Sequence, residues 1–175
     1  EVMQYFDNHY VHEFENVACQ GADRRLELFS PSHYLGDWLK RLPVVVRESN
    51  SKIVASHGCI PDFYKAAKLD TINFYAHERL RLASTYFGMA HAIARAPLLH
   101  HETSILWSRT WFENDGIVVQ DLAKRWDASA FVVGHTIAPS MTPIIHEAGG
   151  IKVVQNDCGN SSWIHDGHYK PRQTI

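Results

Sequence analysis

The chain has 175 residues, and 17 lysines and arginines against 19 aspartates and glutamates give it a formal net charge of −2. Hydrophobic residues make up 45% and charged residues 21%, which is the usage of a folded globular protein and excludes general disorder. The longest apolar runs, such as Ala130-Phe131-Val132-Val133, are far shorter than the ~18–20 residues of a membrane-spanning helix. Because the charge is near neutral and no basic block occurs, nucleic acid is not expected as the main partner.

The cysteines indicate a cellular compartment. Cys19, Cys59 and Cys158 are odd in number, far apart, and include no C-x-x-C pair. This spacing is typical of free thiols in a reducing compartment, so we predict a cytoplasmic protein, while a secreted origin stays open.

The first half of the chain predicts helices around a pair of strands. Leucine and tryptophan side chains recur at the i, i+3, i+4, i+7 spacing of a helix over 33–42, with Ser32 as its N-cap and Pro43 as its end. The other elements predicted here are strands over 44–46 and 52–56 around a turn at 48–51, a helix from 70 or 71 to 82, and a helix over 84–95.

The second half predicts a buried strand and a terminal hairpin. Residues 98–113, with Trp107 and Trp111, predict a loop. A helix over 118–126, a strand over 128–133, and strands over 143–147 and 151–155 around Gly149-Gly150 follow. Strands that alternate with helices and then form a hairpin indicate the α/β class with a mixed sheet. No repeat or long Pro/Gly linker divides the chain, so we predict a single unit.

Two of the predicted strands end in a histidine beside a glycine. The strand over 52–56 runs into His57-Gly58, and the strand over 128–133 runs into Gly134-His135. Ligand sites of α/β sheets form where loops leave the carboxyl ends of strands, and neutral imidazole is a common ligand of zinc, manganese or iron. His57 and His135 could therefore converge on one metal ion; alternatively, each is simply hydrogen-bonded at the end of its strand.

These histidines belong to motifs that resemble those of calcineurin-like metallophosphoesterases. The segment His57-Gly58-Cys59-Ile60-Pro61-Asp62 resembles H-G-G-[LI]-S-P-D, and Val132-Val133-Gly134-His135-Thr136 resembles V-V-G-H-T. Asn156-Asp157-Cys158-Gly159 resembles the D-T-G of the family. Two more segments, around Leu35-Gly36-Asp37-Trp38-Leu39 and at Leu106-Trp107-Ser108-Arg109, are similar to the bacterial-like branch, the Shewanella-like protein phosphatases. Order and spacing agree from about residue 30 to residue 162.

The resemblance implies a phosphatase with a dimetal site. In the family, two divalent ions (Mn, Fe or Zn) about 3.5–4 Å apart hold the phosphate while a hydroxide attacks it. It makes His57 and His135 ligands of the second metal and Arg109 a phosphate clamp, since a guanidinium matches phosphate oxygens bidentately. The implied substrate is a phosphorylated protein or a small phosphoester, and the implied fold is part of an αββα sandwich with a mixed sheet, a helical insert and a terminal hairpin.

Other family motifs are absent from this chain. G-D-x-H-G, G-D-x-x-D-R-G and G-N-H-E, which supply the carboxylate ligands and the general acid, do not occur, although Glu1-Val2-Met3 looks like the continuation of the last. We therefore expect 1–175 to be one incomplete metallophosphoesterase domain, its carboxyl-terminal portion, with the general acid upstream of residue 1 and no catalytic residue within. By itself it is expected to be inactive, because two imidazoles do not complete a metal site.

Several alternatives remain open at this point. The chain could be a non-catalytic metal-binding or interaction module, or a phosphodiesterase on the same scaffold. Arg109 could stack on neighbouring tryptophan rings, and Cys59 could pair with His57 as a nucleophile or fill space as a small packed side chain. Asp62 and Asp157 either orient a ligand histidine or cap turns, and His100-His101-Glu102 reads as a solvated loop.

Overall fold

A computed structural model describes residues 27–28, 30, 32–81, 97–100, 103–112, 116–139 and 142–158. The chain forms two compact units, one of residues 1–42 and 77–95 and the other of residues 43–76 and 96–175. The helix predicted over 84–95 lies outside the described residues. Within the described part, no helix has the length and apolar character needed to cross a membrane. The assignment of 1–175 to one incomplete domain stays a prediction.

Helix α3 (Tyr34–Arg41) lies in the first unit, within the predicted bounds. Its N-cap is His33 rather than Ser32, which corrects the prediction: the His33 side chain accepts from the backbone N–H of Leu35 at 3.4 Å. The Ser32 hydroxyl instead lies 2.8 Å from that of Ser30, so it is engaged before the helix begins. Helical structure ends ahead of Pro43, as expected, because proline disfavours helical backbone in the residue before it.

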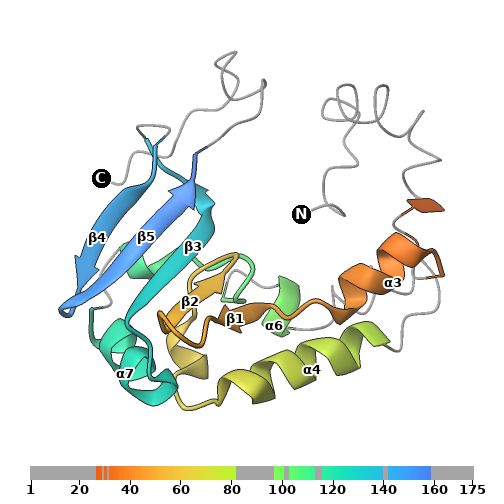
Figure 1. The fold of residues 1–175 in the computed structure, drawn as a ribbon, viewed down its shortest axis with the longest axis horizontal. Coiled ribbons are helices and arrows are strands. Elements are labelled where there is room, and N and C mark those ends of the chain that lie inside the picture. The colour runs from red at the N-terminus through yellow and green to blue at the C-terminus, as the bar shows by residue number, and fades with distance from the viewer. Residues whose placement is uncertain are drawn as a thin grey trace. The chain divides into compact units, whose positions relative to one another are not determined.

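The second unit is built on a five-stranded mixed sheet in the order β1-β2-β3-β5-β4 (Figure 1). Its strands are β1 (Val45–Arg47), β2 (Ile53–Ser56), β3 (Ala130–Ile137), β4 (Ile144–Ala148) and β5 (Ile151–Asp157). The pairs β1–β2 and β4–β5 are antiparallel, whereas β2–β3 and β3–β5 are parallel. The predicted α/β class, mixed sheet and terminal hairpin are therefore confirmed.

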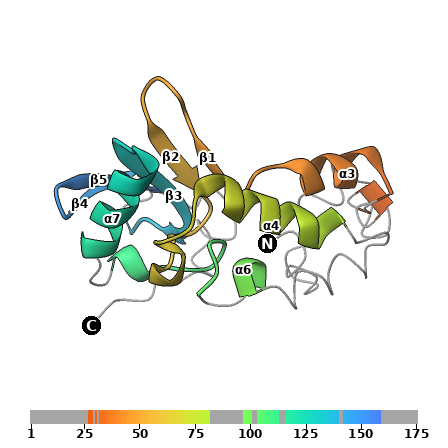
Figure 2. The same cartoon turned by 90° about the horizontal axis from the view of Figure 1, so that it is seen from below.

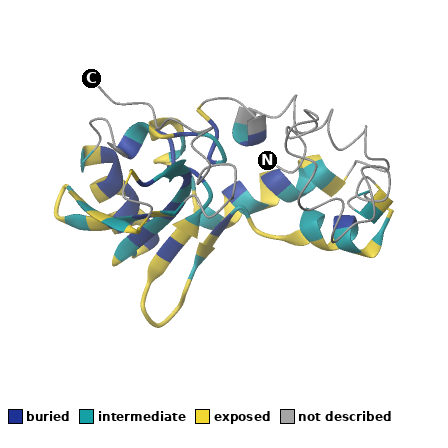
Figure 3. Ribbon diagram, turned by 90° about the horizontal axis from the view of Figure 1, so that it is seen from above, coloured by how far each residue is buried: buried dark blue, intermediate teal, exposed yellow. Residues whose placement is uncertain are grey.

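Helix α7 (Gly116–Trp126) packs on one side of this sheet, against β4 and β5 (Figure 2). It begins two residues before its predicted start and buries Val118, Val119, Leu122, Ala123 and Trp126. In the burial colouring of Figure 3, buried dark blue segments of α7 alternate with intermediate and exposed ones, whereas the loop between β1 and β2 is exposed. Phe131 is fully buried in the same core, and its ring meets that of Trp111 edge-on at 5.0 Å.

The segment predicted as a loop over 98–113 contains two short helices, so that prediction was wrong in part. Helix α6 (Pro97–His100) begins at a proline, which is favoured in the first turn because its missing N–H is not needed there. The 3-10 helix η3 (Thr110–Phe112) includes Trp111, whose indole N–H donates to the Ile60 carbonyl at 2.9 Å. A contact across 51 residues of sequence therefore orders η3, and no local pattern encodes it.

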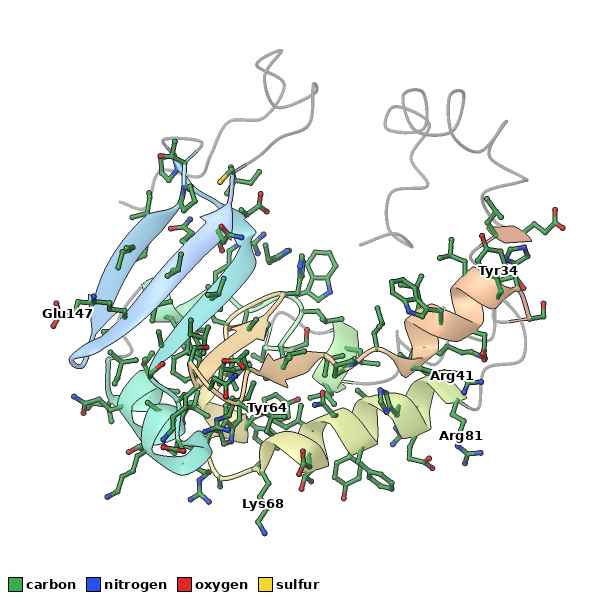
Figure 4. All side chains as sticks on the ribbon, in the orientation of Figure 1. Tyr34, Arg41, Tyr64, Lys68, Arg81 and Glu147 are labelled. Atoms are coloured by element: carbon green, nitrogen blue, oxygen red, sulfur yellow. The ribbon has the colours of Figure 1, made fainter. Side chains whose placement is uncertain are left out.

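Helix α4 (Leu69–Arg81) is attached to the edge strand β1 by one amide side chain. In Figure 4 the labelled Lys68 directly precedes this helix and Arg81 is its last residue. Asn73 Oδ1 accepts from the backbone N–H groups of Val44 and Val45 at 3.0 and 3.1 Å. Its Nδ2 donates to the Val45 carbonyl at 2.8 Å. This side chain thus satisfies three backbone groups near the beginning of the sheet.

We predict that Asn73→Ala lowers the free energy of unfolding by about 1–3 kcal/mol, because it leaves these backbone groups without their partner. Urea unfolding followed by circular dichroism measures the change. The matched control is Asn50→Ala in the exposed turn between β1 and β2, which should stay within about 0.5 kcal/mol of the parent. Equal effects of the two variants would contradict the role of Asn73.

The turn between β1 and β2 contains a carboxylate, that of Glu48, whose pKa lies below its usual value. Hydrogen bonds from the backbone N–H of Asn50 and from the hydroxyl and backbone N–H of Ser51 lower the pKa of Glu48 to about 2. A lowered folded-state pKa stabilises the fold above the unfolded-state value of about 4.3, and this contribution is lost as the pH falls towards 2.

The melting temperature of Glu48→Gln should therefore lie below that of the parent at pH 6, and the gap should narrow as the pH is lowered from 5 to about 2. Scanning calorimetry of the two proteins over this range measures it. A gap that does not change with pH would show that ionised Glu48 does not stabilise the turn.

Candidate functional site

The parallel pairing of β2 with β3 brings the two predicted ligand histidines together. Ser56, the last residue of β2, lies opposite Val133 of β3, so His57 and Gly134 leave the ladder at the same edge of the sheet. The backbone N–H of Gly134 donates to the His57 carbonyl at 2.9 Å. The two imidazole rings then lie with their centroids 5.0 Å apart and their planes inclined by 55°.

His135 occupies an unusual backbone position inside β3. Its φ is +61°, in the left-handed region that side-chain-bearing residues rarely adopt. The register of β3 against β5 shifts in the same place, between Val133 and Ile137. Strained backbone of this kind concentrates at functional sites, where the surrounding structure holds it in place. The residue is 8% exposed, so the strained position lies in the interior of the unit.

A second loop, residues 103–109, closes over the end of β2. The backbone N–H of Gly58 donates to the Ile105 carbonyl at 2.8 Å, and that of Cys59 donates to the Ser108 carbonyl at 2.9 Å. From this loop the Trp107 ring meets the His135 ring edge-on, with centroids 4.8 Å apart. Imidazole and indole are therefore in direct contact at the site.

The ring nitrogens of His57 and His135 meet part of what a metal ion requires of its ligands. Two imidazoles that bind one tetrahedral ion at about 2.0–2.1 Å have ring centroids about 5 Å apart, and those of His57 and His135 are 5.0 Å apart. Their Nε2 atoms are both buried, as is the Thr136 hydroxyl. Within the part of the chain that the structure describes, no cluster of three or more His, Cys, Asp or Glu side chains could hold an ion. The two histidines would thus supply only part of a ligand set.

Arg109, the predicted phosphate clamp, is exposed and follows Trp107 by two residues in the same loop. Among the described residues, its nearest polar contact is a long one, from Nη1 to the Trp107 carbonyl at 3.5 Å. The neighbouring tryptophan rings contact other rings, Trp107 that of His135 and Trp111 that of Phe131. A guanidinium with so weak an intramolecular bond keeps its donors available to a ligand.

The contacts of the other candidate residues favour a structural role over a chemical one. Cys59 is buried in the hydrophobic core, which favours its reading as a small packed side chain. Asp62 opens the 3-10 helix η2 (Asp62–Tyr64) and is paired with Lys65 at 2.7 Å, so it acts in a turn. The Asp157 carbonyl accepts from the Ala138 N–H at 2.8 Å. His101 and Glu102 lie outside the described residues.

Sequence reasoning missed the packing of Trp107 on His135 and the buried amide of Gln155, which is 4% exposed on β5. Trp107 stands in one of the motifs of the resemblance, but nothing in that motif indicates which ring it meets. Gln155 shares a strand face with buried Val153, so a polar residue in an apolar alternation was the available signal.

Comparison with known proteins identifies solved structures that share this fold. No family model matches the chain, and no curated protein matches it significantly. Among solved structures, it is similar to a cold-active protein tyrosine phosphatase, with a TM-score of 0.61 and 17% identity over 87% of this chain and 45% of that one. The cold-active protein-tyrosine phosphatase of a psychrophilic Shewanella species is similar at a TM-score of 0.60 and 17% identity, with 87% of this chain and 46% of that one covered.

This likeness shows a shared fold. The chain spans less than half the length of the structures that it matches. At 17% identity the fold is what the comparison establishes, and the chemistry of the site has to be argued from its own residues.

The close contact between the loops predicts that Gly58 tolerates no side chain. A Cβ at Gly58 would lie 2.9 Å from the Ile105 carbonyl oxygen and 3.1 Å from that of Ser108, both backbone atoms. Gly58→Ala should therefore cost about 1–3 kcal/mol of stability, as overpacking typically does. At Gly134 the nearest atom to such a Cβ is the His57 carbonyl oxygen, at 3.4 Å, so Gly134→Ala is the matched control and should cost less than about 1 kcal/mol. Thermal unfolding measures both, and the opposite ranking would contradict the packing described.

Proposed function

We propose that this chain contributes the imidazole half of a metal-dependent phosphoester hydrolase site. The observation that carries the proposal is the pair of histidine rings, delivered by two neighbouring parallel strands to one edge of the sheet with centroids 5.0 Å apart. Sheet edges of this kind are where α/β proteins bind their ligands. The motif resemblance and the phosphatase fold of the similar structures support the same assignment.

The roles of the residues follow from their positions. His57 and His135 would hold one divalent ion through ring nitrogens, and such an ion supplies Lewis-acid stabilisation and an activated water at neutral pH. Trp107 contacts the His135 ring edge-on, with centroids 4.8 Å apart, and would help to orient that ring for the ion. The glycine beside His57 lets the flanking backbone approach closely, since a Cβ at Gly58 would lie 2.9 Å from the Ile105 carbonyl oxygen.

The proposed substrate is a phosphorylated protein or a small phosphoester. Arg109 would bind phosphate oxygens: it is exposed, and planar guanidinium groups suit bidentate pairing with phosphate. The similar structures are protein tyrosine phosphatases, which supports the phosphate-ester class for this chain. We propose manganese, iron or zinc as the ion, since imidazole accepts each of them.

The ligand set limits what the chain does alone. A dimetal site needs carboxylate ligands that bridge or orient the ions, and the described residues show two imidazoles and no third ligand beside them. We therefore expect weak metal binding and no phosphoester hydrolysis by this chain alone. The same observation favours a second candidate function, a metal-binding or interaction module without catalysis.

Metal binding tests the proposal. In a zinc titration of the 175-residue chain followed by calorimetry, His57→Ala and His135→Ala should each abolish the binding that the parent shows, because one imidazole alone holds an ion poorly. The control is His77→Ala, which removes a half-buried histidine of the other compact unit and should leave binding unchanged. Binding unchanged in both site variants would overturn the shared metal.

Activity separates the two candidates. The parent chain should not hydrolyse p-nitrophenyl phosphate with manganese, whereas a longer protein that contains it should. If that longer protein binds metal through both histidines and is inactive on every phosphoester tested, the module without catalysis is correct. Robust hydrolysis by the 175-residue chain would contradict the expectation that its ligand set is incomplete.

A further inference from the structure

The irregular end of β3 contains more residues than its partner strand can pair. Val133 lies opposite Gln155 and Ile137 lies opposite Asp157, so β3 advances four residues while β5 advances two. The residues between, Gly134 to Thr136, are displaced from the ladder, and such bulges re-aim side chains next to functional sites. His135 is the middle residue of this bulge and has the positive φ of +61°.

The bulge is held on both sides of His135. On one side, the Gly134 N–H donates to the His57 carbonyl at 2.9 Å. On the other side, the Gln155 side chain donates from Nε2 to the Thr136 carbonyl at 2.9 Å. The first bond joins backbone to backbone, and the second depends on a single side chain, so Gln155 is the part of this support that one substitution can remove.

A second hydrogen bond fixes the orientation of the Gln155 amide. Gln155 Oε1 lies 2.8 Å from His146 Nε2 on the neighbouring strand β4. The Thr136 carbonyl can only accept, so the amide NH₂ faces it and Oε1 faces the imidazole. His146 must then carry its proton on Nε2 and donate to Gln155. A chain of two bonds therefore runs from β4 through β5 to the bulge of β3.

We propose that Gln155 is a positioning residue for His135. Gln155 is 4% exposed and lies on β5, next to the bulge of β3. Its hydrogen bond to the Thr136 carbonyl holds the bulge that keeps His135 in the left-handed conformation. This inference rests on the proposed function for its link to metal binding, while its structural part stands on the geometry of the bulge and on the Gln155–Thr136 hydrogen bond. Polar partners behind a metal ligand typically change metal affinity by about 10- to 100-fold when they are lost.

The test is Gln155→Met, which keeps the length of the side chain and removes both the donor and the acceptor. We expect the Cα and Cβ chemical shifts and the HN–Hα coupling of His135 to move away from left-handed values, and the dissociation constant for zinc to rise about 10-fold or more. The matched control is Asn156→Met, the same loss of an amide at the next, exposed position of β5, which should move neither. His146→Phe leaves the Gln155–Thr136 bond in place and should therefore change both readouts less than Gln155→Met does.

The outcomes separate this inference from the proposed function. If the parent chain binds no zinc, the proposed function fails, and the His135 backbone signals of Gln155→Met still decide the role of Gln155. If zinc binds and Gln155→Met changes neither those signals nor the affinity, the inference is overturned while the metal site stands. Should Gln155→Met not fold, Gln155→Glu takes its place: its ionised carboxylate keeps an acceptor for His146 and has no proton to donate to Thr136, and the variant is read by the same backbone signals.

Discussion

The parallel pairing of β2 with β3 is the constraint on which the site depends. Because Ser56 and Val133 lie opposite each other, the residues that follow both strands emerge at one edge, and the Gly134–His57 backbone hydrogen bond joins them there. The histidines are 78 residues apart in the sequence (135 − 57 = 78), yet their ring centroids are 5.0 Å apart.

Three further segments of the second unit make contacts at or near this edge. The loop over 103–109 binds the backbone of Gly58 and Cys59 and brings Trp107 to the His135 ring. The indole of Trp111 pins η3 to the Ile60 carbonyl. From behind, Gln155 reaches the Thr136 carbonyl. The site is therefore a junction of loops on a fixed sheet, which is the usual way that α/β proteins build binding sites.

Elements with a local signal could be predicted from the sequence. The predicted ends lie within two residues of the observed ones for three features: the helix over 33–42, the strand pair before His57 and the terminal hairpin around Gly149-Gly150. Their apolar periodicity and turn residues are properties of the segments themselves. The strand-end histidines were also visible, because a short apolar run followed by His and Gly is a local pattern.

Features fixed by tertiary contacts could not be predicted in this way. The strand before the second histidine was expected to end at residue 133, but β3 continues to Ile137. It does so because pairing with β5 resumes at Asp157 after the bulge. The 3-10 helix η3 depends on Trp111 and a carbonyl 51 residues earlier in the chain. The positive φ of His135 likewise has no counterpart in the residue types, because glycine is the usual occupant of such a position and lies one residue earlier.

The most direct test of the central claim is X-ray absorption spectroscopy at the zinc edge of the chain loaded with one equivalent of zinc. A shared ion predicts scattering from two imidazoles per zinc, with nitrogen at about 2.0–2.1 Å and the remaining ligands oxygen. A spectrum with one imidazole or none per zinc would contradict the convergence of His57 and His135 on one ion, however close their rings lie.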